Sequence, residues 1–170
     1  MGLVRVNKAV GDGTASNLTV TGINTDDVYM VAFSNIFASA NDDMQIRVTT
    51  SGTADSDSEY DFASKDLKTS GSFGNTYGTN NNNIDFSAGI GTSGTNSHNG
   101  ILYLFNFNNS SEYSFITHEN VTTRDDSSDE LFGFQGGAAH TVAEANDGVQ
   151  FFLTGGNNID SGTVTLYKVV

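Results

Sequence analysis

Four carboxylates alternate along one short segment of the chain and have the composition of a cation site. Ca²⁺ takes oxygen ligands from Asp and Glu, and residues spaced by two share one face of an extended chain. The candidate ligands of a structural calcium ion are therefore Asp55, Asp57, Glu59 and Asp61. The alternative is a solvated acidic edge that holds no ion, because acidic surface residues often serve only solubility.

A second acidic run, Asp125 to Glu130, reads Asp-Asp-Ser-Ser-Asp-Glu. Neither run contains the D-x-[DN]-x-[DN]-G pattern that fixes the coordination geometry of a calcium loop. Calcium is the one cofactor that the sequence leaves open, and we expect any bound ion to be structural.

The residue types that most often carry catalysis are present but lack catalytic spacing. His98, His118 and His140 show neither an H-x-H nor an HExxH pattern, so a zinc site would need three distant segments to converge. No G-x-S-x-G elbow occurs. Twenty acidic residues will place some carboxyl pair at glycosidase distance by chance. We therefore expect that the protein is not an enzyme.

Two tyrosines have the amphipathic rings that stack on sugars. Tyr77 lies among Gly, Ser, Thr and Asn residues, which makes it a candidate binding residue, with a loop anchor as the alternative. Tyr103 belongs to the most apolar segment of the chain, Ile101 to Phe107, and is expected in the core.

Charge limits the partners that this chain can bind. Seven Lys and Arg residues against twenty Asp and Glu residues give 170 residues a net charge of −13. Such a balance disfavours nucleic acid and anionic membranes as partners. No apolar run reaches the roughly 18 residues of a membrane span, so membrane insertion is not expected, and the first residues lack a signal-peptide pattern.

Short alternating segments must position these side chains. Cys and Pro are both absent, so stability must come from packing and backbone pairing, and turns must use Gly, Asn and Asp. A long surface loop is expected from Lys65 to Asn83, and Ala138 to Ala145 is the one segment that could form a helical turn. The expected strands are Leu3 to Val10, Leu18 to Gly22, Val28 to Phe37, Met44 to Thr49, Tyr60 to Phe62, Ile84 to Ala88, Ile101 to Phe107, Tyr113 to Thr117, Leu131 to Phe134, Val149 to Leu153 and Val164 to Val170.

Regular short strands with polar connections predict an all-β fold. We expect a two-sheet antiparallel jelly-roll-like sandwich of about ten strands, in which residues 1–170 form a single domain. The expected core contains Phe33, Ile101, Leu104, Phe151 and Leu166.

The N-terminal region, residues 1–22, is expected to act as an anchoring strand region. Arg5 and Lys8 are cationic in a strongly acidic chain and are therefore candidate binding residues for an acidic surface. The alternative is that this segment only completes the edge of a sheet.

Four segments resemble a jelly-roll-like structural domain in virion proteins of marine bacteriophages, especially the cyanophage-type capsid decoration, tail-fibre and appendage proteins. They are Tyr29 to Ile36, Met44 to Val48, Gly100 to Asn106 and the closing Asn158 to Val169. The resemblance spans residues 23 to 170. Because these are packing and turn motifs, it implies a fold and a virion setting and transfers no catalytic residue.

The resemblance implies a bacteriophage virion structural protein, either an external capsid decoration or cement protein or an appendage subunit. Such a protein is made in the host cytoplasm and ends on the virion surface. By analogy we expect a homo-oligomer, a trimer, that contacts other virion proteins. The alternative is a carbohydrate-binding or host-receptor-binding module at a tail-fibre tip, whose partner is a host-surface glycan.

Overall fold

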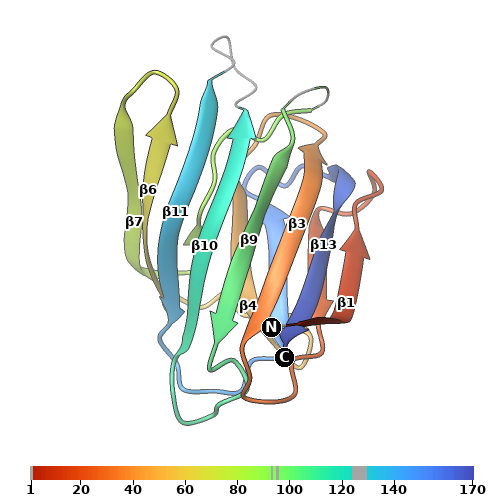
Figure 1. Ribbon diagram of the computed structural model, residues 1–170, viewed down its shortest axis with the longest axis vertical. Coiled ribbons are helices and arrows are strands. Elements are labelled where there is room, and N and C mark those ends of the chain that lie inside the picture. The colour runs from red at the N-terminus through yellow and green to blue at the C-terminus, as the bar shows by residue number, and fades with distance from the viewer. Residues whose placement is uncertain (1, 93, 95, 124–129) are drawn as a thin grey trace.

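Two antiparallel β-sheets lie face to face in the computed structural model, which describes residues 2–92, 94, 96–123 and 130–170 (Figure 1). The larger sheet has the order β1-β13-β3-β9-β10-β11-β6-β7. Its strands are β1 (Leu3–Val10), β3 (Tyr29–Ala38), β6 (Tyr60–Lys68), β7 (Phe73–Asn81), β9 (His98–Phe105), β10 (Ser114–Thr123), β11 (Leu131–His140) and β13 (Ile159–Val169).

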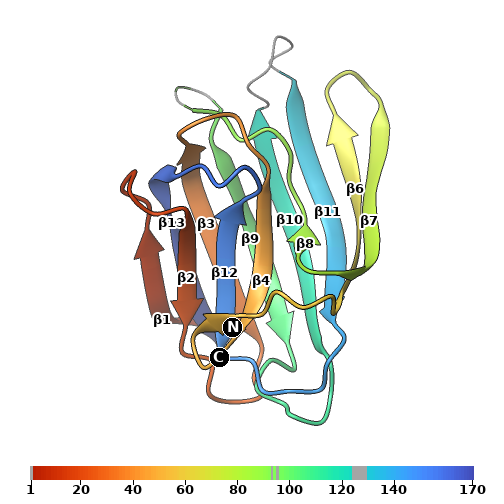
Figure 2. The same cartoon turned by 180° about the vertical axis from the view of Figure 1, so that it is seen from behind.

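The smaller sheet has the order β2-β12-β4-β5, and β8 also pairs with β4 (Figure 2). Its strands are β2 (Asn17–Thr21), β4 (Met44–Thr50), β5 (Thr53–Ala54), β8 (Ile84–Asp85) and β12 (Gly148–Leu153). The described residues contain no helix, which confirms the all-β class and the two-sheet antiparallel sandwich. No helix that could cross a membrane occurs in this part of the chain.

The described residues form thirteen strands rather than about ten, and the largest difference lies between Lys65 and Asn83. This segment was expected to be a loop, but β6 continues to Lys68 and β7 pairs with it along a hairpin. The expectation was wrong because β7 is the edge strand and its residues are exposed or only partly buried, so the segment carries no apolar alternation. The expected helical turn at Ala138 is also wrong, since β11 runs through Ala138 to His140.

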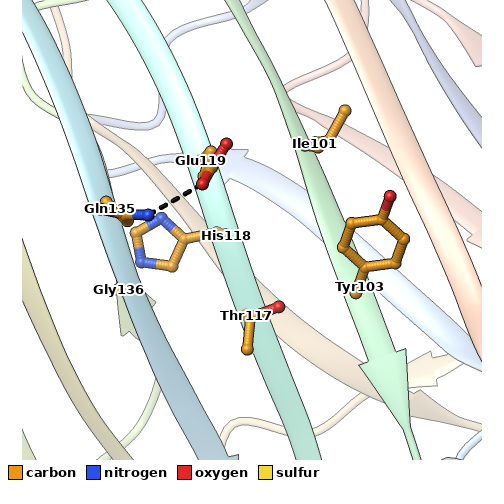
Figure 3. A pocket seen from close by; sticks show the side chains of 7 residues that line it. All are labelled: Ile101, Tyr103, Thr117, His118, Glu119, Gln135 and Gly136. Atoms are coloured by element: carbon orange, nitrogen blue, oxygen red, sulfur yellow. Dashed lines mark hydrogen bonds between the residues drawn. The ribbon is translucent and has the colours of Figure 1, made fainter.

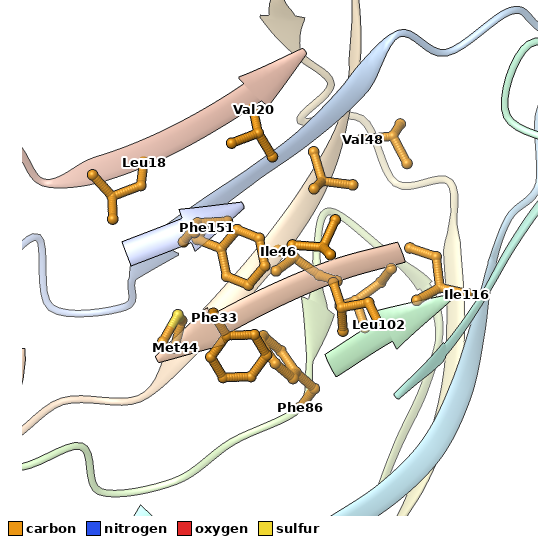
Figure 4. Packing of buried hydrophobic residues seen from close by; sticks show 14 of the residues in the cluster. Leu18, Val20, Phe33, Met44, Ile46, Val48, Phe86, Leu102, Ile116 and Phe151 are labelled. Atoms are coloured by element: carbon orange, nitrogen blue, oxygen red, sulfur yellow. The ribbon is translucent and has the colours of Figure 1, made fainter. Parts of the chain in front are cut away.

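The core fills the space between β3, β9 and β13 on one side and the smaller sheet on the other (Figure 4). Phe33, Leu104, Phe151 and Leu166 are buried there, as predicted. Ile101 is only partly buried, and the expectation that it lies in the core was wrong. Every residue from Ile101 to Phe105 is apolar, so alternation along β9 could not say which side chains point inward.

β10 shows a related error of orientation. Tyr113, Phe115 and Thr117 were expected to mark a strand, and β10 does begin at Ser114 and form a hairpin with β9. However, its buried positions are Ser114, Ile116, His118, Asn120 and Thr122, whereas Phe115 is 44% exposed. Because the buried side of this strand is mostly polar, apolar alternation in the sequence does not indicate which side faces the core.

Candidate functional site

The outer face of the larger sheet, away from the core, has a hollow over β9, β10 and β11. It has a volume of about 500 Å³ and is lined mainly by side chains that point outward. Figure 3 shows them side by side on the three strands. We call this hollow and its continuation toward β7 the outer groove, and its first part is lined by Ile101, Tyr103, Thr117, Glu119 and Gln135.

Strand pairing explains how far the groove extends. The register places one row of outward residues across five neighbouring strands, namely Tyr103, Thr117, Gly137, Ala63 and Tyr77. The three middle residues are small, so a low floor separates two tyrosines. Further hollows of about 490 and 420 Å³ lie over this floor and beside Tyr77. At about 4.8 Å per strand, the row spans about 19 Å, enough for an extended ligand.

The polar lining of the groove can form directional hydrogen bonds. The Gln135 side-chain amide donates to Glu119 Oε1 over 2.8 Å, which holds both groups at the groove wall. Glu119 keeps further acceptor positions, and Gln135 and Thr117 offer both donors and acceptors. A few polar groups beside an aromatic ring are what a site for a hydroxyl-rich ligand needs.

The two tyrosines singled out from the sequence therefore share one face. Tyr77 is 77% exposed on the edge strand β7, not in a loop, and its role in binding stays a prediction. Tyr103 was expected in the core, but it is only partly buried and lines the groove. Sequence reasoning missed Glu119 and Gln135, because nothing local pairs these residues; only the alignment of β10 with β11 does.

Arg5 and Lys8 are both exposed on β1, the opposite edge of the larger sheet from β7. A register shift between Arg5 and Asn7 lets both cationic residues pair with outward positions of β13, Tyr167 and Thr165. The two residues consequently lie on one side of the sheet, where they can contact the same partner.

The first acidic run does not form one extended ligand face. Residues 55–59 turn between β5 and β6, so the spacing by two no longer aligns the carboxylates. Asp55 and Glu59 approach His140, with Asp55 Oδ2 at 2.8 Å and Glu59 Oε2 at 3.4 Å from Nε2. Asp61 is already in β6, lines the outer groove and accepts a hydrogen bond from the Asn80 backbone amide. Calcium binding by Asp55, Asp57, Glu59 and Asp61 as one set stays a prediction that this arrangement does not favour.

The second acidic run lies almost wholly outside the described residues, which exclude 124–129. Glu130 is described, and its Oε1 accepts a hydrogen bond from the Ser70 backbone amide over 2.9 Å.

His98 and His118 form a buried polar network on the inner side of the larger sheet. Asn120 joins them: its Oδ1 lies 2.9 Å from His98 Nε2, and its Nδ2 lies 3.2 Å from His118 Nδ1. Ser64 Oγ lies 2.8 Å from His118 Nε2, and Asn120 also donates to the Phe86 carbonyl. Burial lowers the pKa of both histidines to about 4, so both are neutral at pH 7. This network packs the interior, although His118, which is 3% exposed, also borders the hollow over β9, β10 and β11.

Side chains capable of chemistry thus gather at three places in the described part of the chain: the outer groove, the His98–His118 network and the acidic surroundings of His140. Of these, the groove is the most open to a large ligand. No protein-family model and no curated protein matches this chain. The function of the groove therefore has to be argued from its geometry.

Proposed function

We propose that this protein is a non-enzymatic binding module whose outer groove holds a carbohydrate chain. The observation that carries the proposal is the row from Tyr103 to Tyr77, in which two aromatic rings flank a floor of small residues. The two-layer sandwich supports a jelly-roll type of fold, in which an open sheet face receives the glycan.

Charge favours a neutral glycan over an anionic one. The chain carries a net charge of −13, and Glu119 stands in the groove wall. A sulfated or uronic-acid polymer would be repelled both by Glu119 and by the net negative charge of the protein. Hydroxyl groups, in contrast, can donate to Glu119 and accept from Gln135, while a sugar ring stacks on Tyr103.

Replacing Tyr103 by Ala is expected to weaken binding to neutral glycans by about tenfold or more, since tenfold corresponds to about 1.4 kcal/mol. The measurement is a glycan array with the purified protein, followed by calorimetric titration of the best ligand with wild type and Tyr103→Ala. Glu119→Gln should weaken binding as well, because an amide replaces the charged acceptor.

Tyr113→Ala is the matched control, because Tyr113 is also partly exposed but does not line the groove. It should bind like wild type. Equal loss in both tyrosine variants, or no glycan bound by the wild type, would rule out the groove as a carbohydrate site. Circular dichroism of each variant checks that the fold is intact.

A second candidate function is that of a virion structural protein, an external decoration or appendage subunit at the virion surface that assembles as a trimer or on another virion protein. It rests on the resemblance to phage virion domains and on edge strand β1, which exposes Leu3, Val4, Val6 and Val10 beside two cationic residues. An apolar and locally cationic edge on an acidic body can pair with an acidic partner surface or a sister subunit.

Lys8→Glu is expected to abolish assembly, because it reverses a charge on the edge that would pair. Light scattering coupled to size exclusion measures the oligomer, and co-sedimentation with bare capsids measures attachment. Lys65→Glu makes the same charge change on an exposed position of β6 and should leave assembly unchanged. If the wild type is monomeric and does not bind capsids, the assembly proposal is wrong and β1 only completes the edge of the sheet. Deletion of residues 2–10 tests the same edge without adding a charge. The shortened protein should keep the circular dichroism spectrum of the wild type but lose the oligomer and the attachment to capsids.

A further inference from the structure

His140 is fully buried at the end of β11, yet three carboxylates approach it, two from the turn between β5 and β6 and one from the segment after β11. Asp55 Oδ2 and Glu59 Oε2 approach Nε2 at 2.8 and 3.4 Å. On the other side of the ring, Glu144 Oε1 lies 4.0 Å from Nδ1. Ligand atoms of Asp55, His140 and Glu144 all lie within 4.8 Å of one another. We call these four residues the His140 cluster.

The surrounding structure holds this cluster in place. The Tyr60 ring packs on the His140 imidazole with ring centroids 5.1 Å apart. The Tyr60 hydroxyl donates to the Asp55 carbonyl over 3.0 Å, and Thr141 binds the Glu59 carbonyl through its backbone amide and its hydroxyl. Thr50 Oγ1 donates to Glu144 Oε1 over 3.0 Å. The donor atoms are thus positioned by contacts that do not require an ion.

The charge of the cluster is unbalanced. Three carboxylates face one imidazole, so a neutral His140 leaves three negative charges and a protonated one leaves two. Repulsion between neighbouring carboxylates is relieved when a cation binds between them.

We propose that the His140 cluster binds a divalent transition-metal ion of the Zn²⁺ type through His140 Nε2, Asp55 and Glu59, with Glu144 completing the negative site. Imidazole together with carboxylate is a donor set that suits zinc, whereas calcium takes oxygen ligands only. A tetrahedral ion with bonds of about 2.0–2.2 Å keeps its ligand atoms about 3.4 Å apart. The separation of 3.4 Å between Glu59 Oε2 and Nε2 already has this value. The 2.8 Å between Asp55 Oδ2 and Nε2 is a hydrogen bond, which the ion would replace by moving the two atoms about 0.6 Å apart.

The side chains of Glu59 and Glu144 remain about one third exposed, so an ion can enter from solvent. This site therefore differs from the calcium site expected from the acidic run, both in the ion and in its ligands. It keeps Asp55 and Glu59, excludes Asp57 and Asp61, and adds two residues more than 80 positions along the chain.

Titration of the chelator-treated protein with ZnCl₂, followed by calorimetry and thermal unfolding, tests the proposal. The wild type should bind one ion and show a raised Tm, because an ion that binds only the folded state stabilises it. CaCl₂ and MgCl₂ at the same concentration should leave the Tm unchanged. Glu59 is partly exposed, so Glu59→Gln should not unfold the protein, and this variant should bind Zn²⁺ at least tenfold more weakly.

Asp57→Asn is the matched control, since it removes one negative charge from the same turn without removing a ligand. It should bind Zn²⁺ like wild type. His140→Gln should abolish binding, which excludes His98 and His118 as the ligands. Equal weakening in Glu59→Gln and Asp57→Asn would overturn the proposal in favour of general acidic attraction. A Tm raised equally by Ca²⁺, or no response to Zn²⁺ at all, would overturn it as well.

Discussion

The free energy of unfolding is expected to fall by several kcal/mol as the pH is lowered from 6.5 toward 4. His98 and His118 have an ordinary pKa of 6.5, and burial lowers it to about 4 in the folded protein. Below pH 6.5 these histidines therefore bind protons in the unfolded chain but not in the folded protein. The free energy of unfolding consequently falls with pH until the folded pKa of about 4 is reached. At about 1.4 kcal/mol per pH unit, each histidine accounts for about 3 kcal/mol.

Asp85 works in the opposite direction. Burial, together with the charge of Asp43, raises the pKa of Asp85 from 3.8 to about 6. This carboxyl destabilises the fold at neutral pH, and the penalty disappears as Asp85 is protonated between pH 6 and 4. Asp85→Asn should consequently raise stability at pH 7 and make the acid loss steeper than in the wild type.

Urea unfolding followed by circular dichroism at pH 7.5, 6.5, 5.5 and 4.5 measures both effects. His118→Gln keeps a polar group for Ser64 and Asn120 but cannot titrate. In the Asp85→Asn background, where Asp85 no longer offsets one histidine, adding His118→Gln should reduce the pH slope to about half. A flat profile in the wild type and in Asp85→Asn would mean that the two histidines are not buried in the neutral form.

Phe151→Ala is expected to lower the free energy of unfolding by about 3–5 kcal/mol, the usual cost of a large cavity in a packed core. Phe151 is fully buried on β12 and lies between two other rings, with centroids 5.5 Å from Phe33 and 6.1 Å from Phe86 (Figure 4). These rings come from β3 and from the segment after β8, so the cavity would separate the two sheets.

The matched control is Phe73→Ala. Phe73 is 67% exposed on β7, and the same truncation should cost less than about 1 kcal/mol. Urea unfolding of the two variants at pH 7.5 makes the comparison. Stability like that of the wild type in Phe151→Ala would show that the sandwich is not held together at this point.

Local pattern was sufficient for the strands that cover the core. Met44, Ile46 and Val48 alternate with polar residues, and the structure buries these three side chains while Gln45 and Arg47 stay partly exposed. The pattern failed where both faces of a strand have the same character. β7 is buried on neither side at a sheet edge, and the apolar run in β9 gives no sign that Ile101 and Tyr103 point outward.

The candidate sites depended on information that no local pattern carries. Tyr103 and Tyr77 share a row only because β9, β10, β11, β6 and β7 pair in that order. Asp55 meets His140 because Tyr60 of β6 pairs with His140 of β11, which brings residues 85 positions apart into contact. The spacing by two from Asp55 to Asp61 predicted that the carboxylates share one face of an extended strand. Residues 55–59 form a turn between β5 and β6, so the carboxylates do not align.

The sequence by itself determined the all-β class, the position of most strands and the acidic character that disfavours nucleic acid as a partner. These properties follow from composition and from the period of two, which depend only on near neighbours in the chain. The tertiary structure alone decided the outer groove and the His140 cluster. Their members meet through strand order and register, which are set by backbone pairing and packing between segments far apart in sequence.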